Sequence, residues 1–307
     1  MLSHAMSATQ VCVLSRIPFM NASKMIAGSL VIASACLAGC EGQVSVDLGT
    51  TAPADRAVVQ VLADLEGVEF REAGGGTSRL EFNDPQRVDL IDFLQGNLFR
   101  LFTDEELSDG HYTGVRLLFA DDSDDDDDAV VLANNEDRPL QIVAGDFSTV
   151  DFTVDKNDSS RDRVVLTLDL RQSLAFDDDN DRYTLTPVLL GIRAEDAGQL
   201  SGSVTANCSA GGTLAQGGAA YVFVGSSITP DDRDTTAPEP YLTTAIEADA
   251  NNVLPTFDFP FLPEGDYTLS LTCNGNEDDA ATNDDVRFQN TTNVTVEQGE
   301  RTTQNLQ

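Results

Sequence analysis

Apolar residues recur at every second position in several short stretches of this chain. Val44, Val46 and Leu48 alternate with polar residues, and the same spacing returns at 150–154 and 164–171. Because successive side chains of a strand point to opposite faces, each stretch has one apolar and one polar face. Several such strands separated by turn residues predict antiparallel sheets with one solvated side. The period therefore predicts an all-β protein.

One stretch departs from this period and favours a helix. Between Phe93 and Glu106, Leu94, Leu98 and Leu101 are spaced so that they could share one helical face. We expect a short helix there that connects two strands and is not a core element.

An apolar run near the start of the chain ends in Leu37-Ala38-Gly39-Cys40. Lys24 precedes the run, and its residues from Ile26 onward are apolar apart from two serines. A positive segment, an apolar segment and small residues before a cleavage site are the parts of an export signal. The stretch resembles the lipobox of bacterial lipoproteins, in which the cysteine receives the lipid. We expect a signal peptide at 1–39, lipidation of Cys40 and a lipid anchor in the cell envelope.

The alternative for this run is an uncleaved membrane-spanning helix. A spanning helix needs about 20 apolar residues, and Asn21, Ser23 and Lys24 interrupt the run too early. Two or more acyl chains give durable attachment, so lipid on Cys40 would tether the protein to the membrane. Glu41 follows the cysteine in place of Asp, which favours the outer membrane, with the protein facing the periplasm or the outside.

The charge of the chain is strongly acidic. It has 52 acidic and 18 basic residues, and its formal net charge is −34. Nucleic acids and anionic lipid surfaces are bound through Lys and Arg, so nucleic acid is excluded as a partner. The densest acidic stretch, Asp121–Asp128, lies between two expected strands. Like charges repel, so we expect a solvated hairpin tip, with weak cation binding as the alternative.

Two cysteines remain beyond position 40. Cys208 ends an alternating stretch that starts at Val204, and Cys273 ends one that starts at Leu269. Period two places each thiol on the apolar face of its strand. In an oxidising compartment such a pair predicts a disulfide, with two buried free thiols as the alternative.

Asp177, Asp179 and Asp181 have the spacing of the first three ligands of a calcium loop. Arg182 occupies the position of the required Gly, and Val188 that of the bidentate Glu, which excludes an EF-hand. A looser calcium site contributed by two loops remains an alternative. No other cofactor is expected.

Catalytic chemistry has little support in the sequence. His111 is the only histidine after the expected cleavage site, and it lies between Gly110 and Tyr112 at the start of an expected strand. The sequence has no nucleophile elbow, and it lacks the ligands of a zinc site. We therefore expect no catalytic residues, although a carboxylate pair of the glycosidase type could lie among so many acids.

Five blocks of the chain occur in the order and spacing of a bacterial family. They lie at 51–55, 87–92, 110–117, 168–174 and 183–188. Through them, residues 43–195 resemble domain of unknown function 4382, which occurs mainly in secreted lipoproteins. The turn at 107–110 and the acidic stretch after Phe119 depart from the family pattern without breaking the strand period. The resemblance implies a β-rich envelope domain with no established reaction.

The composition changes after a short polar joint at Ala194–Gln199. Residues 200–307 have fewer long apolar runs and more Gly, Thr and Asn. Residues 261–269 resemble the turn and strand of carboxypeptidase-regulatory-like, transthyretin-type sandwiches. We therefore expect two antiparallel β-sandwich domains, at 43–195 and 200–307, with an exposed loop at Pro230–Pro240.

Together these features favour a lipid-anchored envelope protein that acts as a binding or structural interaction module without catalysis. The expected partners are the membrane, through the lipid, and an envelope protein or a glycan. One alternative is a carboxylate-dependent hydrolase of an envelope or external polysaccharide. The other is an adhesin-like module that calcium stabilises.

Overall fold

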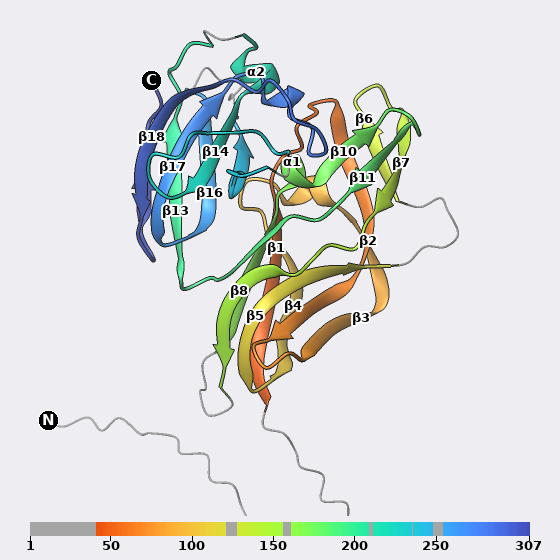
Figure 1. The fold of residues 1–307 in the computed structure, drawn as a ribbon. Coiled ribbons are helices and arrows are strands. Elements are labelled where there is room, and N and C mark those ends of the chain that lie inside the picture. Colours follow the sequence, from red (N-terminus) through yellow and green to blue (C-terminus); the bar gives the residue numbers. More distant parts are fainter. Residues whose placement is uncertain (1–40, 121–127, 156–160, 209–210, 235, 248–253) are drawn as a thin grey trace, which may run out of the picture. The chain divides into compact units, whose positions relative to one another are not determined.

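Strands dominate the protein, as the period-two pattern predicts (Figure 1). The structure, a computed structural model, describes residues 41–120, 128–155, 161–208, 211–234, 236–247 and 254–307. Its helical elements are single turns: η1 (Leu90–Phe93), α1 (Leu170–Ser173), α2 (Leu214–Gly217) and η2 (Gly275–Glu277). Within the described ranges, no helix is long and apolar enough to cross a membrane. The protein is all-β.

The first strand group, β1 to β12, forms two sheets. One sheet has the order β12-β9-β1-β4, from β1 (Glu41–Thr50), β4 (Phe99–Ser108), β9 (Asp162–Leu168) and β12 (Leu189–Arg193). The other has the order β10-β11-β7-β6-β2-β5-β8, with β3 paired to β2. Its strands are β2 (Val58–Glu72), β3 (Thr77–Asp89), β5 (Gly110–Phe119), β6 (Ala129–Leu132), β7 (Asp137–Ile142), β8 (Ser148–Val154), β10 (Leu174–Asp177) and β11 (Arg182–Leu185). Buried side chains of both sheets share one core, so the sheets are the layers of a sandwich.

The second strand group, β13 to β19, also forms two sheets. The smaller sheet has the order β16-β13-β19, and the larger has the order β15-β14-β17-β18. The strands are β13 (Ala197–Ser203), β14 (Ala219–Val224), β15 (Leu242–Ala245), β16 (Thr256–Pro263), β17 (Gly265–Thr272), β18 (Phe288–Val296) and β19 (Arg301–Thr303). A second core lies between them, around Leu200, Val222 and Phe259. Leu190 of β12 also packs in this second core, although it belongs to the first group.

Most neighbouring strands are antiparallel, but three pairs are parallel. β1 runs parallel to β9, β7 to β11, and β13 to β19. The described residues belong to one compact unit. The division into domains at 43–195 and 200–307 stays a prediction.

The prediction of a helix between Phe93 and Glu106 is wrong. Only η1 is helical near it, and residues 99–108 form β4. This strand pairs with β1 from Phe99 to Ser108 and buries Leu101 and Phe102 in the first core. The long-range pairing with β1 outweighs a local spacing of leucines that fits a helix, because strand preference depends on the neighbours that a strand packs against.

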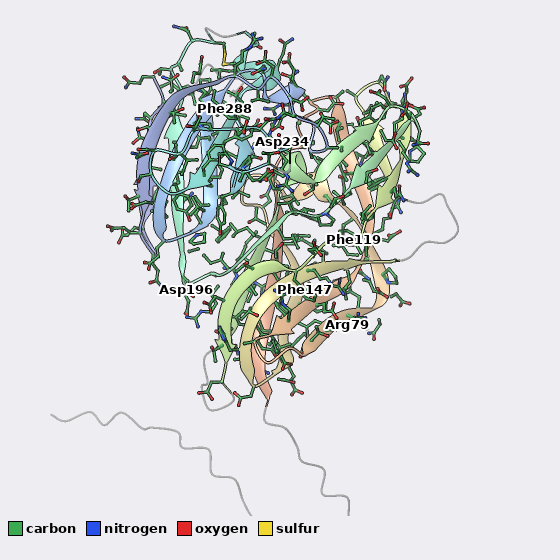
Figure 2. All side chains as sticks on the ribbon, viewed as in Figure 1. Arg79, Phe119, Phe147, Asp196, Asp234 and Phe288 are labelled. Atoms are coloured by element: carbon green, nitrogen blue, oxygen red, sulfur yellow. A yellow bond between two sulfur atoms is a disulfide. The ribbon has the colours of Figure 1, made fainter. Side chains whose placement is uncertain are left out.

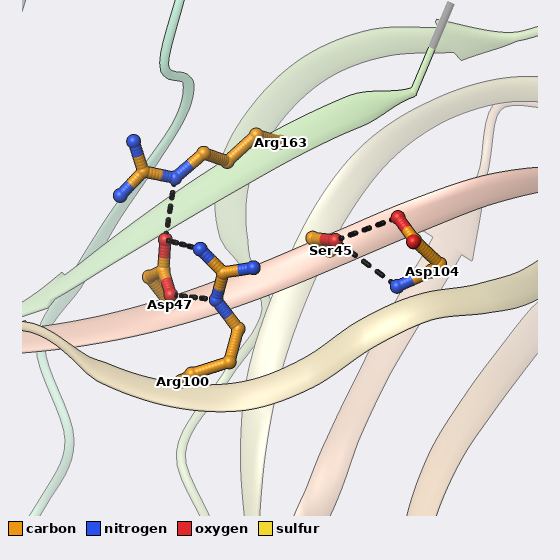
Figure 3. Close-up of polar contacts among 5 residues, drawn as sticks. All are labelled: Ser45, Asp47, Arg100, Asp104 and Arg163. Carbon is orange, nitrogen blue, oxygen red and sulfur yellow. Dashed lines mark hydrogen bonds and ion pairs between the residues drawn. The ribbon is translucent and has the colours of Figure 1, made fainter.

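β1 is fixed from both sides by polar contacts on the face opposite the first core (Figure 3). Asp47 is 1% exposed. Arg100 of β4 donates two hydrogen bonds to its carboxylate, and Arg163 of β9 donates a third at 2.6 Å. Ser45 lies nearby, and its hydroxyl oxygen accepts the backbone N–H of Asp104 at 3.0 Å. Charged side chains of three adjacent strands thus hold the middle of this sheet together.

Candidate functional site

A buried carboxylate, Asp169, joins the two strand groups. Its residue precedes α1 and caps it, accepting the N–H of Gln172 at 3.2 Å, as an N-cap aspartate does. The hydroxyl of Thr51, just after β1, donates to it at 2.9 Å. From β15, Thr243 donates its backbone N–H at 2.6 Å and its hydroxyl at 2.8 Å. We call these four residues the Asp169 junction. Asp169 is 1% exposed, and hydrogen-bond donors in α1, in β15 and just after β1 offset the cost of burying its carboxylate.

Arg171 is a second charged residue of the first group that reaches the second group. Its side chain is completely buried, and Nη1 donates to the backbone carbonyl of Gly275, which follows β17. The guanidinium carbon lies 5.9 Å from the ring centroid of Tyr221 in β14. Among the described residues, Nε and Nη2 have no hydrogen-bond acceptor. The charge of this guanidinium also acts on the buried carboxyl of Asp278, whose pKa it lowers.

Three carboxylates of the second group lie together, and Arg171 interacts electrostatically with one of them, Asp278. We call Asp232, Asp278 and Asp284 the acidic cluster, because an oxygen of each lies within 4.8 Å of the others. They come from the loops that follow β14 and β17. In the same loops, Asp234, which is labelled in Figure 2, accepts a hydrogen bond from Asn283.

Each carboxylate of the acidic cluster also accepts a hydrogen bond from a backbone N–H. Asp284 donates to Asp232 at 2.6 Å, Arg233 to Asp278 at 3.3 Å, and Asp279 to Asp284 at 2.8 Å. Carboxylate oxygens at this spacing suit a hard cation such as Ca²⁺. The acidic cluster could hold such an ion, but its geometry is also explained by the loop's own hydrogen bonds.

Asp278 has the most perturbed carboxyl of the cluster. It is 2% exposed. Burial raises its pKa to about 6, while the hydroxyl of Tyr221, which donates to it, and the charge of Arg171 lower the pKa and so limit the rise. Burial also raises the pKa of Tyr221 well above its usual value. Asp278 is therefore partly protonated in a pH range where ordinary aspartates are ionised.

Two clefts flank the loop that follows β17. The larger cleft, of about 600 Å³, has one wall from the β10–β11 hairpin and the other from Arg233, Ala280 and Ala281. The smaller cleft, of about 470 Å³, lies between Asp55, Arg138 and Tyr183 on one side and residues 276–279 on the other. Phe176 lines both clefts. Both therefore have walls from the first and the second strand groups.

The predicted calcium residues lie in the turn of the β10–β11 hairpin. Asp177 accepts hydrogen bonds from the N–H of Asn180 at 3.2 Å and from its side-chain amide at 2.7 Å, and the amide lowers the pKa of Asp177. Asp181 faces Arg138 at 3.2 Å. Asp177 and Asp179 line the larger cleft. In the described part of the chain, the acidic cluster is the group of close potential metal ligands, and it contains none of the three. The calcium site at Asp177, Asp179 and Asp181 stays a prediction.

The structure places Cys208, Cys273 and His111, which the sequence analysis singled out. Cys208 and Cys273 form a disulfide, with sulfurs 2.07 Å apart. His111 is exposed on β5, and its Nε2 lies 2.7 Å from the carboxylate of Asp151. Cys40 and residues 121–127 of the acidic stretch lie outside the described residues.

Sequence reasoning missed the acidic cluster and the residues around Asp169. The loop at Pro230–Pro240 was expected to be exposed because of its composition, yet Asp232 is 2% exposed. One feature of the sequence could have indicated the role of Asp169, because an aspartate just before Leu170 fits the N-cap of a helix. Nothing local shows that Tyr221 would bury Asp278, because the two are 57 residues apart.

The hairpin of the larger cleft and the Asp169–Arg171 segment both fall inside a stretch with a family match. Residues 41–187 match the DUF4382 family model, and we call this stretch the DUF4382 segment. That family is described as a domain of unknown function. The acidic cluster and β13 to β19 lie outside the DUF4382 segment.

The other comparisons add no functional argument to the DUF4382 match. No curated protein matches the chain. Among solved structures, the Bacillus anthracis TIE protein is similar at 9% sequence identity, over 86% of this chain and 33% of that protein, with a TM-score of 0.19. So low a TM-score supports neither a shared fold nor a shared function.

Proposed function

We propose that the protein is a lipid-anchored cell-envelope protein that acts as a non-catalytic binding or structural interaction module. The observation that carries the proposal is the larger cleft, whose walls come from the DUF4382 segment and from the second strand group. The lipobox-like residues 37–40 support the anchor, and Glu41 after the cysteine supports an outer-membrane address. The turn between β16 and β17 supports a carboxypeptidase-regulatory-like second domain.

The larger cleft suits a ligand with both apolar and hydroxyl groups. Phe176 and Val188 provide apolar surface, Thr184 and Thr186 provide hydroxyl groups, and Arg233 provides a cation. Sites that combine apolar walls with a few polar groups bind small ligands and projecting chains of larger partners. An envelope glycan or a loop of an envelope protein fits this composition.

The fixed relation between the two walls favours binding without large rearrangement. The Asp169 junction and the bond from Arg171 to Gly275 both lie beside the elements that form the cleft. A preformed site loses less conformational entropy on binding than one that must be assembled.

Site-specific photo-crosslinking in intact cells tests the proposal. A photoreactive amino acid at Ala281, which is exposed and lines the larger cleft, should capture a discrete glycan or protein partner. The matched control carries it at Ala133, an exposed residue in the β6–β7 turn that does not line the cleft. Filling the cleft with Ala280→Trp should remove the adduct at 281. No adduct at 281, or the same adducts at both positions, would contradict a binding role for this cleft.

The second candidate is the carboxylate-dependent hydrolase. It is favoured by Asp278, whose pKa is raised to about 6 and which lines the smaller cleft together with Asp55 and Asp279. A raised carboxyl pKa beside other carboxylates is typical of glycosidase acids. Release of reducing ends from envelope or external polysaccharides, abolished by Asp278→Asn, would support the hydrolase over the binding module.

A further inference from the structure

The first strand begins one residue after the cysteine that is proposed to carry the lipid. β1 starts at Glu41, which pairs with Ser108, and Gly42 pairs with Leu107. Gly42 packs so closely on Val154 of β8 that a Cβ atom at position 42 would overlap that side chain. Val44 is already fully buried. The folded sheet therefore begins where the anchor would end, with no linker between them.

β1 cannot rotate independently of the sheet about such an anchor, because it is paired with a strand on each side. It pairs with β4 on one side and with β9 on the other. The bonds of Asp47 to Arg100 and Arg163 lie on its outer face (Figure 3). The orientation of the strand relative to the anchor is therefore the orientation of the whole first sheet.

The elements beside the start of β1 form one end of the DUF4382 segment. The turn between β4 and β5 lies there, because Glu41 pairs with Ser108. The end of β8 and the beginning of β9 lie there too, since Gly110 pairs with Val154 and Val44 with Asp162. Exposed side chains at this end include those of Ser108, Asp109, His111 and Asp155. We call this end the β1-start face.

The opposite end of β1 leads to the second strand group. Thr51 follows the strand and donates to Asp169, which also bonds Thr243 of β15. A strand rises about 3.3 Å per residue, so the ten residues of β1 span roughly 30 Å. The Asp169 junction thus lies about that far from the start of the strand.

We propose that the β1-start face lies directly against the lipid headgroup layer, and that β1 acts as a rigid post holding the Asp169 junction roughly 30 Å from it. This orientation rests on the lipid anchor at Cys40 proposed above. The absence of a linker leaves the face no room to move away from the headgroups. The larger and the smaller cleft, both lined by Phe176 of β10, then lie near the end of β1 that is far from the anchor, because Thr50 pairs with Leu168 just before α1 and β10. Because Asp109 and Asp155 are acidic, the face suits zwitterionic headgroups better than anionic ones.

Short-range fluorescence quenching tests this orientation. The lipidated mature protein is reconstituted in phosphatidylcholine vesicles that contain lipid with a nitroxide on the headgroup. A bimane is attached either at Ser108→Cys, on the β1-start face, or at Ala133→Cys, in the β6–β7 turn near Ala57. Both residues are exposed, and the native cysteines 208 and 273 are joined in the disulfide. We expect the label at 108 to lose roughly half of its emission and the label at 133 to keep nearly all of it, because β1 separates the two ends by about 30 Å.

A variant with an inserted linker tests the position of the β1-start face separately from membrane attachment through Cys40. Ten residues rich in Gly and Ser, beginning with Glu, are inserted between Cys40 and Glu41, which allows a mean extension of about 18 Å. This variant should remain on the vesicles and recover its emission at 108. Equal emission at 108 and 133 in vesicle-bound protein, or quenching at 108 that survives the linker, overturns the orientation while the anchor stands. Flotation of Cys40→Ser with vesicles overturns the anchor itself.

Discussion

Replacing Asp278 by Asn should stabilise the protein at neutral pH. The carboxyl is 2% exposed, and burial raises its pKa from 3.8 to about 6. Each unit of this shift corresponds to 1.36 kcal/mol, so ionising the buried group costs about 3 kcal/mol of folding stability. An Asn keeps an oxygen that can accept the N–H of Arg233 and an amide that can bond the hydroxyl of Tyr221, and it carries no charge.

The sign of the pH dependence follows from the direction of the shift. Between pH 4 and 6, the folded protein retains a proton on Asp278 that the unfolded chain has released. The stability of the wild type should therefore fall, relative to Asp278→Asn, as the pH rises through this window and level off above it. Urea unfolding of both proteins at intervals from pH 4 to 8 measures the difference. Asp285→Asn, an exposed residue of the same loop, is the control and should change stability by less than about 0.5 kcal/mol.

The same measurement decides between a proton and a cation at the acidic cluster. If the cluster holds calcium, the carboxylate of Asp278 is the stabilised form, and Asp278→Asn would destabilise the protein when calcium is present. The burial of Asp278 would not destabilise the protein if the wild type became more stable relative to Asp278→Asn as the pH rises from 4 to 6. A wild-type Tm that falls when a chelator is added would refute it too. A difference that does not change with pH would refute it as well.

Three further predictions concern stability. Asp169→Ala leaves buried donors of both strand groups without an acceptor and should cost about 3 to 5 kcal/mol, measured by urea unfolding; a loss below 1 kcal/mol would contradict the junction. Replacing Cys208 and Cys273 by Ala opens a loop of 65 residues and should cost about 4 kcal/mol in the chain-entropy model, and an unchanged Tm would argue against it. Gly42→Ala forces a methyl group into Val154 and should cost about 1 to 3 kcal/mol, whereas Gly74→Ala, where nothing lies within 4 Å, is the matched control.

Features that depend on near neighbours in sequence could be predicted, and those that depend on distant ones could not. Val44, Val46 and Leu48 face the first core as their alternation indicates, because period two is a property of the strand itself. The leucines after Phe93 follow a helical spacing, but Leu101 lies in β4, whose pairing with β1 decides its structure.

The candidate site shows the same limit. Asp232 lies in a polar segment that reads as an exposed loop, and its burial depends on residues about 50 positions away, such as Asp284. The hairpin turn at Asp177 could be expected from its acidic composition. Its position opposite Ala280 in the larger cleft follows only from the packing of the two strand groups.

The place of β1 in its sheet has a consequence for the order in which the chain can fold. Asp47 meets Arg100 after 53 residues but meets Arg163 only after 116. When the chain is made from its N-terminus, one edge of β1 therefore stays unpaired until β9 has been made. Open strand edges invite pairing with other chains, and a charge on the edge discourages it. We therefore expect the charge of Asp47 to discourage pairing with other chains during that delay, and its carboxylate to accept the hydrogen bond of Arg163 once β9 has paired.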